Sequence, residues 1–164
     1  SHLIEKNPAK AKQFNDTLAD VYRYILQNKG RNLVLLREEI AFLQNYFDLL
    51  KIRFENALQF INTVDDSFYD TVLIPPISLQ TLMENAVKHN EFSDASPLLI
   101  EMKIENDMLQ FKNTLRKKKL RKISSRIGLT NLNERYKLTT EKEIQYTEKE
   151  NVFVVQLPIL HTIS

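Results

Sequence analysis

The sequence predicts an α+β fold in which helices pack on one face of a β-sheet. Two long segments with helical periodicity come first, over residues 8–27 and 36–54. Strand-like segments follow, mostly as hairpin pairs, with shorter helical segments between them. This order is typical of a two-layer sandwich of helices on a sheet. The length of 164 residues suits one domain, alone or with a helical appendage.

Composition excludes several classes of site. The chain has no cysteine, which rules out a disulfide framework, a thiolate zinc site and a cysteine nucleophile. No apolar run approaches the roughly 20 residues that span a membrane, and no signal-peptide pattern is present. We therefore expect these residues to lie in the cytoplasm. Because the sequence starts within a helical pattern, we also expect a fragment of a longer protein.

The first predicted helix has one apolar face. In residues 8–27 the apolar side chains follow one another at spacings of four, three, one and three, which places them on one face of a helix. They are Phe14, Leu18, Val21, Tyr22 and Ile25. Gly30 follows shortly afterwards, and a glycine just past the last periodic residue predicts the helix end.

The second predicted helix, over residues 36–54, carries two apolar stripes. The first contains Leu36, Ile40, Leu43, Phe47, Leu50 and Phe54. The second contains Phe42, Tyr46 and Leu49. An apolar surface this broad needs more than one packing partner. Either both stripes are covered within the chain, or one of them is an oligomer surface.

Shorter elements follow these helices. They are a strand over 58–64, a helix from about Ser78, a hairpin over 98–113, a helix over 127–138 and a hairpin over 143–158. Apolar and polar side chains alternate on either side of Asn106-Asp107, which predicts the turn of the first hairpin. Pro158 is expected to stop the second one.

A polar stripe accompanies the apolar face of the helix from Ser78. Thr81, Asn85, Lys88 and His89 follow at spacings of four, three and one. An amide oxygen can ligate Mg²⁺ and a cation can neutralise phosphate oxygens, so this stripe suits a metal–phosphate group. The alternative is a solvated helix face with a Glu84–Lys88 pair four residues apart.

Two further residues are candidates for ligand contact. Asn113 falls on the same strand face as Leu109 and Phe111, which should face the core. A buried amide requires hydrogen bonds, either to a ligand or as a cap at the strand end. Gly128 starts a helix, where backbone amides can approach phosphate; an ordinary loop-to-helix junction is the alternative.

The charge distribution is uneven. Seven basic residues and no acidic one lie between Lys112 and Lys122, although the formal net charge is only +2. Such a run forms a solvated loop or contacts phosphates of a nucleotide or a nucleic acid. No aromatic residues are interleaved to stack on bases, and we expect no nucleic-acid partner.

In this order, the segments resemble the C-terminal ATP-binding part of sensor histidine kinases, within the gyrase/histidine-kinase ATPase superfamily. The LytS/YehU-like subgroup is the most similar. LIPPISLQTLMENAVKHN (73–90) looks like the N-box, and IGLTNLNERY (127–136) looks like the G-box with its helix. VYRYILQNKGRNLVLLREEIAFLQNYFDLLKIRF (21–54) resembles the paired helices that precede the ATP-binding domain in this subgroup.

The resemblance implies a role for each candidate residue. Asn85 would coordinate Mg²⁺, and Lys88 and His89 would contact phosphate or the nucleoside. Glu84 would handle water or a proton, so Glu84 and Lys88 are the catalytic candidates. Asn113 stands where the superfamily has an adenine-binding aspartate. The other cofactor-binding candidates are Arg126, Gly128 and Leu129, and residues 114–125 would form the lid over ATP.

The resemblance also implies an organisation and a function. Residues 1–56 would be the end of the helical dimerisation region, 57–160 the ATP-binding domain with a mixed sheet, and 161–164 a tail. The chain would transfer phosphoryl groups from MgATP to an upstream histidine and then to a response regulator, expected to be of the LytTR type. The parent protein would be a homodimer anchored in the bacterial inner membrane.

Departures from the family pattern leave an alternative open. The phosphoacceptor Asn-Pro-His motif is missing: His2 does not match it, and Asn7-Pro8 is followed by alanine. This fragment is therefore expected not to autophosphorylate in the usual way. Ser124 and Arg126 stand where the family has glycines. The alternative is a degenerate, nucleotide-independent module of the same fold, acting through dimerisation and partner docking.

Overall fold

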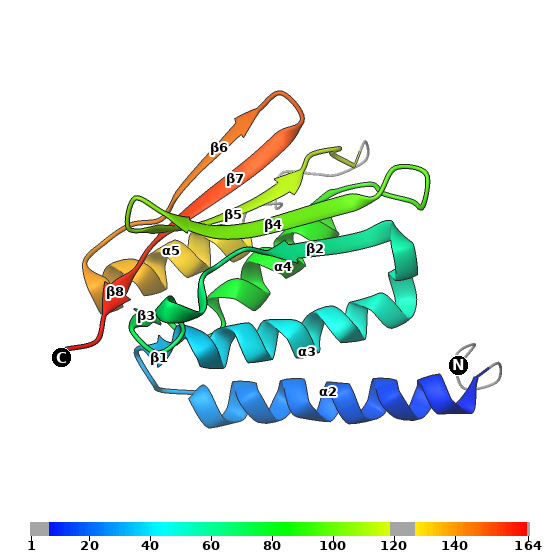
Figure 1. The fold of residues 1–164 in the computed structure, drawn as a ribbon, viewed down its shortest axis with the longest axis horizontal. Helices are drawn as coiled ribbons and strands as arrows, with labels where there is room; N and C mark the ends of the chain where they lie inside the picture. The colour runs from blue at the N-terminus through cyan, green and yellow to red at the C-terminus, as the bar shows by residue number, and fades with distance from the viewer. Residues whose placement is uncertain (1–6, 119–126, 164) are drawn as a thin grey trace.

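The fold is a mixed five-stranded sheet with its helices stacked beneath one face (Figure 1). This computed structural model describes residues 7–118 and 127–163. Helices α3, α4 and α5 lie next to the sheet, and α2 packs on α3 on the side away from the sheet. The predicted α+β class and the two long N-terminal helices are thereby confirmed. None of the helices in the described part of the chain is both long and apolar enough to cross a bilayer.

Helix α2 (Pro8–Asn28) begins at a side-chain cap. The Oδ1 atom of Asn7 accepts a hydrogen bond from the backbone N–H of Lys10 at 3.1 Å, and Pro8 occupies the first helical position, where its missing N–H costs nothing. Gly30, with φ of 87°, lies just after the helix end, as predicted. The Asn7-Pro8 pair therefore serves as a helix start in this chain.

Helix α3 (Leu36–Phe54) is covered on both sides within the chain. Its Phe42 and Leu49 pack against Val21 of α2. On the opposite side, Leu36 and Leu43 are fully buried in the main core beneath the sheet. The question that the two apolar stripes left open is thus answered by packing inside the monomer.

The main sheet has the strand order β2–β4–β5–β7–β6. Its strands are β2 (Leu58–Asn62), β4 (Leu98–Glu105), β5 (Met108–Thr114), β6 (Gln145–Lys149) and β7 (Val152–Pro158). Strand β2 runs parallel to β4, and every other neighbouring pair is antiparallel. Asn106 and Asp107 both adopt positive φ at the β4–β5 turn, the conformation that two-residue hairpin turns favour.

A second, three-stranded sheet lies beside the main one (Figure 1). It joins β1 (Val34–Leu35), β3 (Val72–Ile74) and β8 (Leu160–His161). The sequence did not predict β1 or β8, because two residues are too few to display an alternating pattern. His161 pairs with Val72 in this sheet. The domain boundaries at 56/57 and 160/161 stay predictions.

Helices α4 (Ser78–His89) and α5 (Ile127–Thr140) lie side by side under the sheet. Leu79, Leu82 and Met83 of α4 are fully or almost fully buried. Tyr136 anchors α5 to the sheet: its ring is fully buried, and its hydroxyl donates to the Pro158 carbonyl at 3.1 Å. These contacts fix the two helices that frame the candidate site.

The Tyr46 hydroxyl at the α3–α4 interface gives a pH-dependent prediction. Burial chiefly raises the pKa of Tyr46 to about 12, helped by the negative charge of Glu84 and opposed by a hydrogen bond with Gln80. Between the ordinary value of 10.0 and about 12, the unfolded chain has released this proton while the folded chain retains it. The free energy of unfolding therefore falls as pH rises through this window.

We expect Tyr46→Phe to remove this contribution. The slope of unfolding free energy against pH should become less negative by about 1.4 kcal/mol per pH unit within the window. Urea unfolding at a series of alkaline pH values measures this slope. Parallel curves for the variant and the wild type would show that Tyr46 ionises equally easily in the folded and unfolded chains.

Candidate functional site

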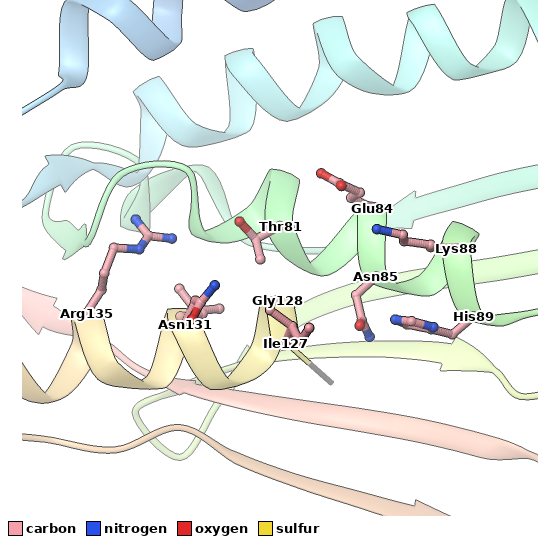
Figure 2. Close-up of a pocket in the computed structure, with 10 residues that line it drawn as sticks. Thr81, Glu84, Asn85, Lys88, His89, Ile127, Gly128, Asn131 and Arg135 are labelled. Atoms are coloured by element: carbon pink, nitrogen blue, oxygen red, sulfur yellow. The ribbon is translucent and has the colours of Figure 1, made fainter. Parts of the chain in front are cut away.

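A pocket of about 470 Å³ opens between α4 and the first turns of α5. We call it the α4–α5 pocket. Figure 2 shows side chains of both helices directed into the space between them. The lining residues are Thr81, Glu84, Asn85, Lys88, His89, Ile127, Gly128, Asn131, Leu132 and Arg135. The structure thus brings the predicted polar stripe together with two further candidates: Thr81, Asn85, Lys88 and His89 line the pocket with Glu84 and Gly128.

Asn85 is the most constrained polar group of the pocket. Its side chain is 7% exposed, and its Oδ1 atom is buried with no hydrogen-bond partner among the described residues. In Figure 2 it points from α4 towards the start of α5. A buried amide oxygen without a partner costs about 1–3 kcal/mol, so this atom is available to accept a hydrogen bond from, or coordinate, a molecule or ion held in the pocket.

The flanking residues of α4 are more accessible. Glu84 and Lys88 are exposed, and His89 is partly buried. Glu84 Oε2 accepts a hydrogen bond from Gln80 Nε2 at 2.9 Å. The alternative of a solvated helix face therefore fits Glu84 and Lys88 but not Asn85, whose side chain is enclosed.

Helix α5 contributes two polar residues that sequence reasoning missed. Asn131 and Arg135 line the pocket together with Gly128. Their spacing of three and four residues places all three on one helix face, and that spacing was the available signal. The Arg135 guanidinium donates to the carbonyl of Pro76, just ahead of α4. Burial lowers the pKa of Arg135, while the negative charge of Glu39 opposes this.

The three remaining candidate residues are not among the described residues that line this pocket. Leu129 is 1% exposed and belongs to the core, so its side chain does not line the α4–α5 pocket. Asn113 is buried on the core side of β5, as predicted, and its Nδ2 donates to the Thr114 carbonyl at 2.7 Å. Arg126 lies outside the described residues, as do positions 119–125 of the expected lid. Roles for these three in ligand binding stay predictions.

Asn90, the last residue of segment 73–90, has a structural role. Its Nδ2 donates to the Ala86 carbonyl at 2.9 Å, and its Oδ1 accepts from the Arg116 amide at 2.7 Å. The amide of Glu91 donates to the Arg116 carbonyl at 2.8 Å. The segment that follows β5 is therefore tied to the end of α4, beside the pocket.

Part of the basic run forms ion pairs. Lys117 lies 2.7 Å from Glu148 of β6, and Lys112 lies 3.6 Å from Glu101 of β4. These pairs neutralise two of the seven cations with carboxylates of the sheet. The basic run is therefore not a uniform patch of positive charge over its described part.

The donor set indicates what the pocket can hold. Among residues 7–118 and 127–163, no group of three His, Cys, Asp or Glu side chains is arranged to hold a metal ion. A metal would therefore need ligands from a bound anion and from water besides the Asn85 oxygen. Mg²⁺ has this habit, because it keeps several waters and takes substrate phosphate oxygens. Lys88 at the rim can supply positive charge to the same anion.

Comparison with known proteins shows similarity to histidine kinases in sequence and in fold. Residues 1–58 match the histidine kinase family model. Over 89 residues, 54% of this chain, the sequence is 32% identical to sensor histidine kinase/phosphatase LytS of Staphylococcus aureus. That region is only 15% of the relative's length. The catalytic domain of histidine kinase ThkA has a similar fold: the TM-score is 0.51 at 16% identity, covering 77% of this chain and 93% of that one.

The two glycines of the chain should respond oppositely to alanine. Gly128 is helical without a positive φ, and an added Cβ would meet only the Thr81 Cγ2 atom, at 3.8 Å. Gly30 has φ of 87° and open space around it. We expect Gly128→Ala to keep or raise stability, by up to about 1 kcal/mol, because alanine favours helix.

Gly30→Ala should instead lower stability by about 1–2 kcal/mol, because an alanine pays for the left-handed conformation. Urea unfolding of both variants provides the comparison. If Gly128→Ala were the more destabilising of the two, the helical conformation at Gly128 would be wrong.

Proposed function

We propose that this chain, which belongs to the histidine kinase family and is LytS-like in sequence, is the ATP-binding catalytic part of a two-component sensor kinase. The buried, unpartnered Asn85 oxygen in the α4–α5 pocket carries this proposal. The histidine-kinase fold supports it. The parent protein would pass the γ-phosphoryl group of MgATP to a histidine upstream of this chain and then to a response regulator.

The residues of the pocket fit a magnesium–nucleotide complex. Asn85 offers one hard oxygen ligand in a buried position, and the nucleotide phosphates and water would complete the shell. The ion would supply charge neutralisation at the phosphate oxygens during phosphoryl transfer. No further metal ligand from the described residues is required by this assignment.

The chain's own residues would hold and orient the nucleotide. Lys88 would neutralise phosphate oxygens, and His89 would contact phosphate or the nucleoside. Glu84, exposed at the rim, would accept a proton or position a water molecule. Gly128 would let the start of α5 approach phosphate closely. Phosphoryl transfer depends mainly on positioning the nucleotide and neutralising its charge. Residues of these types can supply both.

The remaining expectations extend this assignment. Asn113 would read the adenine, and residues 114–125, with Arg126 and the backbone at Leu129, would close over ATP. The chain would work in the cytoplasm as part of a homodimer joined through its N-terminal helices. Its parent would be anchored in the bacterial inner membrane, and its response regulator would be of the LytTR type.

One observation favours the alternative of a nucleotide-independent module. At position 113 an amide replaces the carboxylate of the superfamily, and its N–H already donates to the neighbouring Thr114 carbonyl. A neutral amide also accepts a weaker hydrogen bond from adenine than a carboxylate does. On this alternative the fold would act through dimerisation and partner docking.

Calorimetric titration with a non-hydrolysable ATP analogue, with Mg²⁺ or with EDTA, separates the two proposals. We expect Mg²⁺-dependent binding in the micromolar range, about −7 to −8 kcal/mol. Asn85→Ala should weaken binding at least about tenfold, since even outer partners of metal ligands contribute that much. Asn45→Ala is the matched control, because Asn45 is exposed on α3 and does not line the α4–α5 pocket.

Each outcome decides between the proposals. Equal binding by Asn85→Ala and wild type would overturn the site assignment. No heat from folded wild-type protein at millimolar nucleotide would support the nucleotide-independent module. Circular dichroism of each variant establishes that lost binding is not lost folding.

A further inference from the structure

The chain enters α4 through a turn with an unfavourable backbone conformation. Ile77, the residue before the helix, has φ of 68°, in the left-handed region. For a β-branched residue this conformation is an outlier and costs free energy. It persists only where surrounding contacts hold it. Those contacts therefore fix the start of α4 and, two turns later, the position of Asn85.

A buried carboxylate of α3 is the main contact. The Ile77 amide donates to Glu39 Oε2 at 2.8 Å, and the Leu79 amide donates to Glu39 Oε1 at 3.2 Å. Glu39 is completely buried. It thus provides acceptors for amides at the start of α4 that have no partner within the helix. Burial raises the pKa of Glu39, and these hydrogen bonds oppose the rise.

The same turn is also held from α5. The Arg135 guanidinium donates to the Pro76 carbonyl, one residue before Ile77. Figure 2 shows Arg135 extending from α5 towards the segment that leads into α4. Arg135 and Glu39 are therefore hydrogen-bonded to consecutive residues of one turn, Pro76 and Ile77. The position of α4 relative to α5 across the pocket depends on both contacts.

Tyr24 connects this arrangement to α2. Its hydroxyl donates to Glu39 Oε2 at 2.6 Å, the oxygen that also accepts from Ile77. Its ring stacks on Phe42 of α3, with centroids 4.1 Å apart. Burial, above all, raises the pKa of Tyr24, so the hydroxyl keeps its proton and remains a donor. Helix α2 contributes no residue to the lining of the α4–α5 pocket.

We propose that Glu39 is a positioning residue for the nucleotide site and that the Tyr24–Glu39 hydrogen bond couples the placement of α2 to the affinity of that site. A shift of α2 along or away from α3 would remove a donor from the oxygen that holds Ile77. The strained turn would then relax, and Asn85 would move relative to α5. This inference rests on the proposed nucleotide-binding function.

The test compares two tyrosine-to-phenylalanine variants of the same helix. Tyr24→Phe deletes only the hydroxyl and keeps a ring to stack on Phe42. Tyr22→Phe makes the same change at a side chain that is 60% exposed. The first readout needs no nucleotide: amide hydrogen exchange at Ile77 and Leu79, and the NMR signals of the Asn85 side-chain amide. The second is the affinity for a non-hydrolysable ATP analogue with Mg²⁺.

We expect Tyr24→Phe to speed exchange at Ile77 and Leu79, to shift the Asn85 signals and to weaken nucleotide binding about three- to tenfold. Tyr22→Phe should change none of these. Glu39→Gln, which keeps the side-chain volume but replaces one acceptor oxygen, should have a larger effect in the same direction. If it fails to fold, Tyr24→Phe still decides.

A purely structural role for Tyr24 would lower the unfolding midpoint without changing these readouts in the folded protein. That result would overturn the proposal, as would faster exchange at Ile77 and Leu79 with unchanged affinity. If the wild type binds no nucleotide, the proposed function fails. The exchange rates and the Asn85 signals then still show whether Tyr24 fixes the start of α4.

Discussion

The buried carboxylate of Glu39 is the interaction on which the arrangement of the helices depends. A charge removed from water costs several kcal/mol unless hydrogen bonds and opposite charge compensate it. Here three donors come from two neighbouring helices: the Tyr24 hydroxyl of α2, and the amides of Ile77 and Leu79 at the start of α4. Because one carboxylate needs donors from both neighbours, α2 and α4 cannot be repositioned on α3 independently of each other.

Asn85 of α4 and Asn90, the residue that follows α4, differ in how their side chains are hydrogen-bonded. Both polar atoms of the Asn90 side chain have a partner: Nδ2 donates to the Ala86 carbonyl and Oδ1 accepts from the Arg116 amide, so Asn90 ties the segment after β5 to the end of α4. Asn85 occupies a similarly buried position, yet its Oδ1 atom has no partner in the described structure. Two asparagines five positions apart and similarly buried therefore differ in their hydrogen bonding: the side chain of Asn90 is satisfied within the fold, whereas the Oδ1 atom of Asn85 is not.

Sequence reasoning predicted what is periodic and local. The long helices, the two hairpins and the polar stripe containing Asn85 follow from spacing and turn residues. The two-residue strands β1 and β8 were missed because pairing with β3, distant in sequence, creates them. Glu39 was missed because an acidic residue in a predicted helix is normally interpreted as solvent-exposed. Its hydrogen-bond donors come from α2 and from the start of α4, which are distant in sequence.

Helix α3 belongs physically to both halves of the chain. Its Leu36 and Leu43 are core residues beneath the sheet, while its Phe42 and Leu49 pack against α2. A boundary at residue 56 follows the order of segments along the chain, but the hydrophobic core continues across it. A displacement of α2 would therefore act on an element that is already part of the hydrophobic core beneath the sheet. Glu39 lies on α3 between Leu36 and Leu43, where such a displacement meets the start of α4.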